Sequence, residues 1–313
     1  MSVRQFPACP RVIRDPTTWF GCVCALAIAT LLAGADSSSA GVLGSWTQYQ
    51  GNAAHTAYIP GTVKPADIAP IWSVSSNSLG MSHLNVGAVT DANHVYLTAY
   101  SHFSYETRGS STDFVWNYKA IALDRLSGQE MWTRQLKSYD STTSAPSIGN
   151  GKVYVHVGGE SSVVGAVPSR YPQLVGVDAA SGAVSFSTPH LGRTANSPPT
   201  VHNDRVYVET GEINGVSGFT SNGHKLWDRG LSWPYRSIAA ADDQYVYTYS
   251  TKVNAIVPNS GATAFSITPQ DNSGGNLVLG DLNDAIAVAE THDEVKSFDL
   301  EGRVERWSRY GDY

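Results

Sequence analysis

Aromatic and cationic side chains gather in two insertions and in several connecting segments of this sequence, where they could stack on a ligand and donate hydrogen bonds to it. The insertions span roughly residues 101–117 and 160–172. The candidate binding residues are Phe103, Tyr105, Trp116, Arg170, Tyr171, Arg193, Trp233 and Arg236. Exposed loops commonly carry function, and aromatic residues with arginine are enriched at interfaces. We expect a binding face here; the alternative is that the insertions pack on themselves.

Motifs of the common catalytic centres are absent from the sequence. It has no Gly-x-Ser-x-Gly, His-Glu-x-x-His, P-loop or dinucleotide fingerprint, and its nine histidines show no ligand spacing. Cys9, Cys22 and Cys24 all lie in the first 40 residues, so the remainder has no thiol for a disulfide, metal or nucleophile. We therefore assign no catalytic residue and no metal ligand.

The candidate residues interrupt a motif that returns five times. Each repeat has a β-type run, a second apolar run, a turn that ends in glycine, and a large aromatic residue a few positions later. The first runs centre on Tyr96, Tyr154, Tyr207, Tyr247 and Ile286, the turn glycines are Gly128, Gly182, Gly223, Gly261 and Gly302, and the aromatics are Trp132, Phe186, Trp227, Phe265 and Trp307. A strand-rich repeat of about 40 residues indicates a β-propeller blade. The predicted fold is all-β, a propeller of four-stranded blades.

The second repeat divides most clearly into four strands, which we place at residues 145–148, 152–157, 174–178 and 183–186. The turns between them contain Asn-Gly and Ser-Gly, which suit tight hairpins. The regular position of the aromatic residue after each glycine favours packing between blades. Asp124, Asp178 and Asp299 precede the turns, and we expect their carboxylates to accept backbone N–H bonds there.

The repeats resemble the pyrroloquinoline-quinone-like β-propeller repeat family, also called the quinoprotein alcohol dehydrogenase-like superfamily. The resemblance rests on Ala122-Leu123-Asp124-Arg125-Leu126-Ser127-Gly128 with Trp132, on its near-copy at 177–182, and on Asn222-Gly223 with Trp227. The segment from Trp46 to Thr56 also looks like the usual start of such chains. The resemblance covers residues 46–313.

The resemblance leaves three functions to compare with the residues present. Quinone-dependent dehydrogenases of the superfamily hold their cofactor with a stacking Trp, Ca²⁺ ligands and often two adjacent cysteines. Adjacent cysteines are absent here, and Glu160, Glu209 and Glu212 are better explained as loop carboxylates than as Ca²⁺ ligands. We therefore expect no cofactor. The leading hypothesis is an exported, non-catalytic propeller that binds or scaffolds a protein or an extended ligand. The alternatives are a quinone- and calcium-dependent oxidoreductase of alcohols or sugars, and a carbohydrate-binding propeller.

The N-terminus predicts export. Arg4, Arg11 and Arg14 precede an apolar run from Trp19 to Ala33, and Ala33-Gly34-Ala35 fits a cleavage site. We expect residues 1–40 to be a signal peptide and leader, with an uncleaved anchor helix as the alternative. The product would be secreted, periplasmic or extracellular. The net charge of −6 argues against a nucleic-acid partner and against a polybasic membrane surface.

Residues 46–76 precede the first repeat and contain one plausible strand, Ile71–Val74. Rings of this family commonly have seven or eight blades, whereas five repeats are recognised here. We therefore expect an incomplete arc, or a propeller completed by another chain, in which two blade faces would expose apolar side chains.

Overall fold

The computed structural model of the chain describes residues 45–56, 69–108, 111–159, 170–192, 197–210, 215–231, 238–269, 275–280, 284–289 and 294–310. The chain divides into units 1–43 and 44–313, and all described residues belong to the second. The proposed signal and leader lie outside the described residues. Within the described part, no helix is long and apolar enough to cross a membrane.

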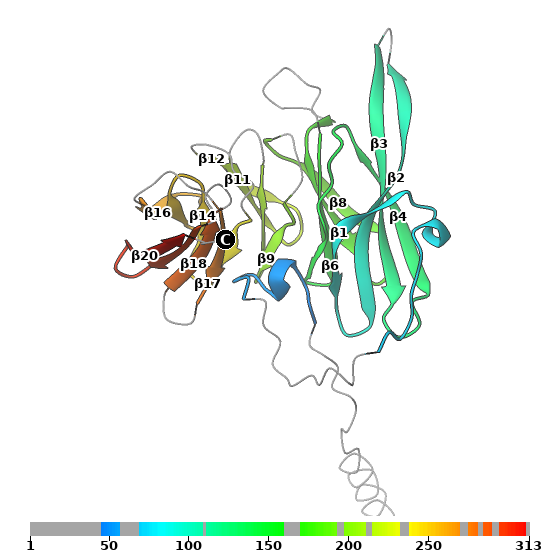
Figure 1. Cartoon of the computed structure of the whole chain (residues 1–313). Coiled ribbons are helices and arrows are strands. Elements are labelled where there is room, and N and C mark those ends of the chain that lie inside the picture. Colours follow the sequence, from blue (N-terminus) through cyan, green and yellow to red (C-terminus); the bar gives the residue numbers. More distant parts are fainter. Residues whose placement is uncertain are drawn as a thin grey trace, which may run out of the picture. The chain divides into compact units, whose positions relative to one another are not determined.

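Five antiparallel sheets of four strands each follow one another along the chain (Figure 1), which confirms the predicted fold class. The first sheet comprises β1 (His83–Thr90), β2 (His94–Arg108), β3 (Ser111–Asp124) and β4 (Glu130–Ser138). The second comprises β5 (Ser147–Gly149), β6 (Lys152–Val157), β7 (Gln173–Asp178) and β8 (Val184–Pro189). The third comprises β9 (Thr200–His202), β10 (Arg205–Glu209), β11 (Gly215–Thr220) and β12 (Lys225–Gly230). The fourth comprises β13 (Ala240–Ala241), β14 (Val246–Tyr249), β15 (Val253–Ile256) and β16 (Thr263–Ile267), and the fifth comprises β17 (Gly275–Leu279), β18 (Asp284–Ala289), β19 (Glu294–Asp299) and β20 (Val304–Tyr310).

One row of residues across each sheet explains the repeat. In the third sheet, Tyr207 on β10 lies opposite Gly218 on β11, which lies opposite Trp227 on β12. The other rows are Tyr96–Ala122–Trp132, Tyr154–Gly176–Phe186, Tyr247–Ala255–Phe265 and Ile286–Ser297–Trp307. The small middle residue makes room for the two large side chains. A Cβ on Gly218 would lie 2.4 Å from the indole of Trp227, which is closer than two carbon atoms can approach. The sequence motif is therefore a packing unit.

The aromatic residue at the end of the row joins each sheet to the next. Trp132 donates its indole N–H to the carbonyl of Ala179, at 2.9 Å, in the turn of the second sheet. The ring lies against Gly182 in the same turn, where an added Cβ would be 2.7 Å from an indole carbon. Trp132 and Trp227 are 9% and 8% exposed, so their predicted burial between blades is confirmed.

Gly182 and Gly151 offer a matched test of this packing, since both have φ of 70°. A Cβ at Gly151 would meet no atom within 4 Å, whereas one at Gly182 would enter the Trp132 ring. We expect Gly151→Ala to cost about 1 kcal/mol for its left-handed backbone and Gly182→Ala to cost about 3 kcal/mol. Urea unfolding measures both. Equal costs would show that the ring moves aside freely.

The three predicted turn carboxylates act as expected. Asp124 accepts the N–H of Ser127 at 2.7 Å, Asp178 accepts that of Ser181 at 2.8 Å, and Asp299 accepts that of Gly302 at 2.8 Å. Gly302 therefore occupies the same position in its turn as Ser127 and Ser181, three residues after the aspartate. The assignment of Gly302 as the fifth turn glycine is therefore wrong by one residue: Arg303 takes the left-handed position, with φ of 56°.

Residues 46–55, which we call the central segment, join the innermost strands of all five sheets. One residue on the first strand of each sheet faces this segment, and the five residues occupy the same position in their sheets. Each lies opposite a small apolar residue of the second strand, which is Val95, Val153, Val206, Val246 or Ala285. Their backbone N–H groups donate to the segment in chain order. In the first two sheets, Thr90 donates to the carbonyl of Trp46 and Ile148 to that of Thr47. Val201 of the third sheet donates to the side chain of Gln48, and Ala241 and Leu279 of the last two sheets donate to the carbonyls of Ala53 and Ala54. Each of these bonds is 2.6–2.8 Å long.

Gln48 is the side chain in this series, and its replacement tests the segment. The buried amide donates to the carbonyl of Val201 at 2.9 Å and accepts the N–H of Val201 at 2.8 Å. We expect Gln48→Ala to lower the free energy of unfolding by about 2–3 kcal/mol, because both backbone groups would be left buried without these partners. Urea unfolding checks this, with the less deeply buried Gln50→Ala as the control. A loss below about 0.5 kcal/mol would show that water replaces the amide.

Residues 71–74 do not form the predicted strand. Trp72 and Val74 nevertheless turn inward as a strand would, and with Leu79 and Met81 they cover an apolar face of the first sheet at Ile121 and Leu123. Trp72 also donates its indole N–H to the carbonyl of Arg125 at 2.9 Å, beside Gly128. The segment therefore occupies the position of a preceding sheet's last strand, but no strand pairs with it in the described part of the chain.

The sheets pack in chain order, and the two outer faces of the series differ. Apolar clusters join the first sheet to the second, the second to the third, the third to the fourth and the fourth to the fifth. The far face of the fifth sheet exposes Ile286 by 41% and Trp307 by 44%, whereas the tyrosines equivalent to Ile286 are buried. A closed ring is not seen among the described residues, and one of the two predicted bare faces is instead covered by residues 72–81.

Candidate functional site

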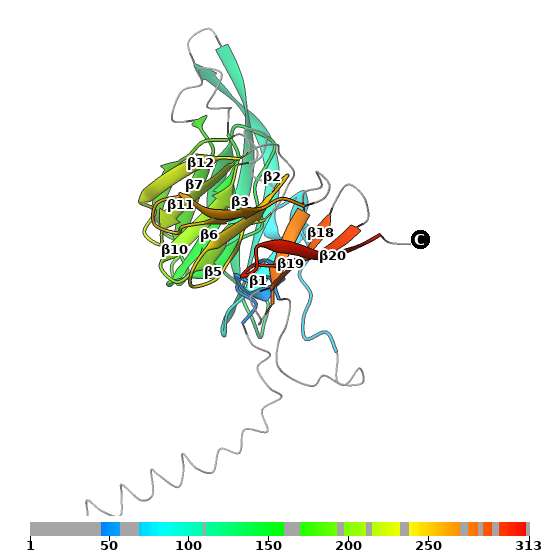
Figure 2. The ribbon, with the colours of Figure 1, turned by 90° about the vertical axis from the view of Figure 1, so that its left-hand side faces the viewer.

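The first insertion is a continuation of β2 and β3 rather than a loop, and it extends this hairpin beyond the rest of its sheet (Figures 1 and 2). Phe103 lies opposite Trp116, and Tyr105 lies opposite Phe114. Because alternate residues of a strand share a face, these four rings line one side of the hairpin. We call them the aromatic stripe.

The rings of the aromatic stripe contact one another and are open to solvent. The centroids of Phe103 and Trp116 are 6.4 Å apart, those of Phe103 and Tyr105 5.9 Å, and those of Tyr105 and Phe114 5.0 Å. Phe103, Tyr105 and Phe114 are 51–59% exposed, and Trp116 is partly buried against Tyr100. The rings of this insertion are therefore largely exposed rather than packed under other parts of the described structure.

The opposite side of the hairpin is polar. Lys137 donates to Glu106 at 2.6 Å and lowers the pKa of that carboxyl, and the hydroxyl of Tyr139 donates to the same group at 3.2 Å. Arg170 pairs with Asp113, and its guanidinium lies 5.4 Å from the ring centre of Tyr139. Arg170 thus braces the hairpin from behind and is separate from the stripe, although the sequence placed them on one face.

The remaining candidates divide as follows. Tyr171 follows Arg170 and is half-buried. Arg193, Trp233 and Arg236 lie outside the described residues. The structure therefore brings together Phe103, Tyr105 and Trp116 from the predicted set with Phe114, the fourth aromatic residue of the first insertion.

A cavity of about 440 Å³ lies where the central segment meets β1 and the residues just before β5, β9 and β13. Its lining includes Trp46, Gln48, Tyr49 and Gln50 from that segment. The other lining residues are Gly87, Ala88, Val89, Ala145, Pro146, Pro198 and Ile238. No residue of this lining is ionisable except Tyr49, so its donor set consists of amides, a phenol, an indole and backbone groups.

This lining does not fit a quinone held with Ca²⁺, since calcium prefers several carboxylate and carbonyl oxygens. No group of three His, Cys, Asp or Glu side chains in the described ranges could hold a metal ion. Of the glutamates considered from the sequence, Glu209 is buried at the end of β10, and Glu160 and Glu212 lie outside the described residues.

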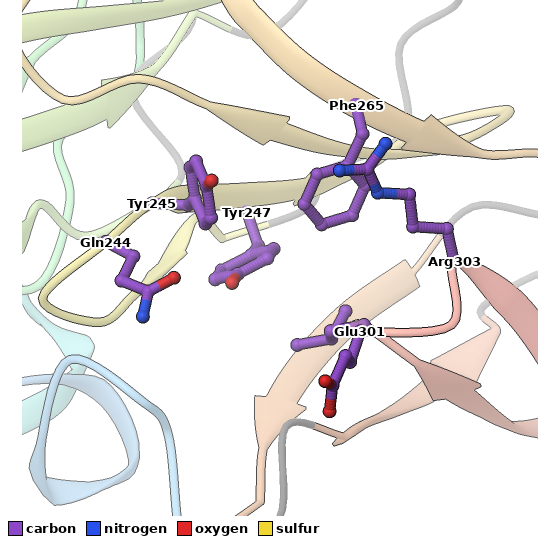
Figure 3. A pocket seen from close by; sticks show the side chains of 7 residues that line it. Gln244, Tyr245, Tyr247, Phe265, Glu301 and Arg303 are labelled. Atoms are coloured by element: carbon purple, nitrogen blue, oxygen red, sulfur yellow. The ribbon is translucent and has the colours of Figure 1, made fainter.

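A second cavity, of about 300 Å³, separates the fourth sheet from the turn of the fifth (Figure 3). Gln244, Tyr245, Tyr247 and Phe265 line one side of it, and Leu300, Glu301 and Arg303 line the other. Arg303 holds its guanidinium 4.8 Å from the ring centre of Phe265, where the other sheets place a glycine against the ring. Arg303 thus occupies the place against the ring that glycine occupies at the turns beside Trp132, Phe186 and Trp227.

Buried histidines are a further feature that sequence reasoning missed. The rings of His156 on β6 and His190 are fully buried, with centroids 4.7 Å apart. Burial lowers the pKa of His190 to about 4, and burial together with repulsion from His190 places that of His156 well below its usual range. Two neutral imidazoles thus face one another between the second and third sheets, where His190 also contacts Phe219.

The fold and its repeated aromatic row define a β-propeller of the quinoprotein type. A profile of the family described as "Outer membrane protein assembly factor BamB" matches residues 117–309, and the chain belongs to this family. A search of curated proteins found no match.

Solved structures of similar fold include two dehydrogenases, and a weaker similarity is found to a BamB structure. A europium-containing methanol dehydrogenase is 13% identical, with a TM-score of 0.59, over 86% of this chain and 58% of its own. The quinohemoprotein alcohol dehydrogenase from Comamonas testosteroni is 12% identical, with a TM-score of 0.59, and the match covers 91% of this chain and 52% of the dehydrogenase. BamB from Moraxella catarrhalis is 14% identical, with a TM-score of 0.48, and the match covers 66% of this chain and 63% of BamB. The chain therefore spans about half to three fifths of the structures it matches.

Proposed function

We propose that this protein is an exported, non-catalytic propeller that binds a polypeptide partner during the assembly of outer-membrane proteins. The aromatic stripe carries the proposal, because three adjacent rings more than half exposed on a projecting hairpin are costly to leave in water and are typical of interaction sites. The family description supplies the process, assembly of outer-membrane proteins.

The edges of the hairpin favour an extended partner. β1 pairs with β2 only as far as Tyr100, and β4 pairs with β3 only from Trp116 onward. Beyond these points the described strands pair with each other alone, so backbone groups on both outer edges are open to another strand. A partner strand with alternating aromatic residues would add to an edge and place its rings beside the stripe.

A binding measurement with a synthetic peptide in which aromatic and polar residues alternate tests this proposal. We expect Phe103→Ser and Tyr105→Ser to weaken binding at least about tenfold each without changing stability, since both side chains are exposed. Leu126→Ser is the control, because Leu126 is an exposed apolar residue in the turn between β3 and β4. Binding that is indifferent to the stripe would overturn the proposal.

Two further assays address the alternative functions. Turnover of alcohols or aldoses with a dye acceptor, after incubation with the quinone and Ca²⁺, would show an oxidoreductase. We expect no turnover, because the cavity beside the central segment offers no carboxylate. Glycan-array binding that is lost on Trp116→Ala or Trp233→Ala would instead show a carbohydrate-binding propeller.

The export part of the proposal rests on residues 1–40. We expect the exported product to begin near Asp36 or Gly41, as the small residues before these positions suit signal cleavage. Mass spectrometry of the product checks this, and a product that retains Met1 contradicts cleavage.

A further inference from the structure

In four of the five sheets, one carbonyl in the turn before the last strand accepts a hydrogen bond from an aromatic side chain that precedes the sheet. The acceptors occupy the same position in their turns, and each donor is an indole N–H or a phenol O–H. The pairs are Trp72 with Arg125, Trp132 with Ala179, Tyr154 with Ser221, and Trp227 with Pro258, at 2.8–3.0 Å. An aromatic ring with a donor on its edge is therefore the group that this carbonyl receives.

The fifth sheet lacks this contact. Leu300 holds the position of the acceptors, directly after the aspartate of its turn. Phe265 on the fourth sheet has no donor, and the hydroxyl of Tyr247 donates to Asp242 at 3.1 Å. No donor to the carbonyl of Leu300 is found among the residues that the structure describes.

The cavity of about 300 Å³ lies at this position (Figure 3). Leu300 lines it from one side, and Tyr245, Tyr247 and Phe265 line it from the other. The ring of Tyr245 meets those of Tyr247 and Phe265 edge to face, at centroid distances of 6.0 and 5.6 Å, so the three rings hold one another in place. A preformed aromatic wall opposite an acceptor suits a flat ring that can donate a hydrogen bond.

Arg303 adds an oriented positive charge to the cavity. Its guanidinium lies 4.8 Å from the ring centre of Phe265, and this cation–π contact holds the group without using its N–H donors. No carboxylate of the described residues pairs with Arg303. In Figure 3 the carboxylate of Glu301 points away from it, toward the other end of the gap. A guanidinium with unused donors prefers a carboxylate, which it can bind through two parallel hydrogen bonds.

We propose that this cavity binds a small aromatic acid, a flat ring that carries an N–H or O–H donor and a carboxylate. The ring lies against Tyr245 and Tyr247, its donor bonds to the carbonyl of Leu300, and the carboxylate accepts the N–H groups of Arg303. The site is separate from the aromatic stripe, which lies on the first sheet.

Isothermal titration calorimetry with indole-3-propionate tests the three contacts together. We expect a Kd at or below about 1 mM, as is usual for a ligand of about 14 non-hydrogen atoms. The methyl ester lacks the charge and the 1-methyl derivative lacks the donor, so each should bind at least about tenfold more weakly. Absence of binding by indole-3-propionate would overturn the proposal. Tighter binding by tryptamine, which carries a cation instead, would assign the charge recognition to Glu301 and would overturn it equally.

Arg303→Gln separates the carboxylate contact from the rest of the site. Arg303 is exposed, so we expect the variant to fold, to bind indole-3-propionate at least about tenfold more weakly and to bind the methyl ester as the wild type does. Arg306→Gln is the matched control, because Arg306 carries the same charge but pairs with Asp284 and Asp299 of its own sheet. Equal binding of the acid by wild type and Arg303→Gln would contradict the proposal.

Phe265→Trp fills the site from within the chain. It gives the fourth sheet the indole that Trp132 and Trp227 provide elsewhere, and its N–H should take the carbonyl of Leu300. We expect this variant to lose binding of indole-3-propionate while its free energy of unfolding in urea is equal to or greater than that of the wild type. A folded Phe265→Trp chain that binds the acid as before would place the ligand elsewhere and would overturn the proposal.

Discussion

Lowering the pH from 7.5 to 5 is expected to reduce the free energy of unfolding by at least about 4 kcal/mol, through His55 and His190 together with His156. Burial lowers the pKa of His55 and His190 to about 4, and that of His156 well below its usual range. Below about pH 6.5 the unfolded chain therefore takes up protons that the folded chain does not, and stability falls as the pH falls. His55 and His190 each contribute about 2 kcal/mol of this loss at pH 5, and His156 adds to it in the same direction.

Urea unfolding between pH 5 and 7.5 measures the effect, and its slope gives the number of protons taken up. His156→Asn should reduce the slope, because the amide does not titrate in this range. A stability that is flat from pH 7.5 to 5 would show that the folded protein accepts these protons.

Replacing Trp132 or Trp227 with alanine is expected to cost about 3–5 kcal/mol, as for other large buried aromatics. Each indole packs against the glycine turn of the next sheet and donates a hydrogen bond to it, so its loss opens a cavity and leaves a turn carbonyl without its donor. Urea unfolding at neutral pH gives the magnitude.

Trp307 is the matched control for both substitutions. It occupies the equivalent position of the fifth sheet, opposite Ser297, but is 44% exposed. We expect Trp307→Ala to cost less than about 1 kcal/mol in the isolated chain. Equal costs at Trp132 and Trp307 would show that the row stabilises its own sheet rather than the contact between sheets.

Local sequence patterns predict the repeated part of this fold well. The strand predicted at 152–157 coincides with β6, and the four strands of the second repeat all exist, because alternation and glycine turns are encoded within a few residues. The aromatic positions behind the turns also follow from local spacing. Arg303 is the exception, since an arginine there takes a backbone conformation that glycine usually takes, and the motif search chose the neighbouring glycine.

Contacts between distant residues are where sequence reasoning fails. The central segment is held by backbone N–H groups of five strands, which every residue except proline possesses, so no residue type marks the partners. Residues 71–74 have the alternating pattern of a strand and pack like one, but strand formation also requires a neighbour to pair with. In the first insertion, the aromatic residues at alternate positions, Phe103 and Tyr105 on one strand and Phe114 and Trp116 on the other, do encode the aromatic stripe. Arg170 lies on the other side of the hairpin because it pairs with Asp113, a contact between distant residues.

The central segment also determines when the fold can be completed during synthesis. It precedes every sheet it joins, and the bond from the ring of His55 to the carbonyl of Leu277 spans 222 residues. Sheets form from neighbouring strands and can fold as they emerge, whereas closing so long a loop is slow and entropically costly. A nascent chain with four finished sheets still holds the carbonyl of Ala54 without its donor, Leu279. The contacts of the central segment can therefore be completed only after β17 of the fifth sheet has been synthesised.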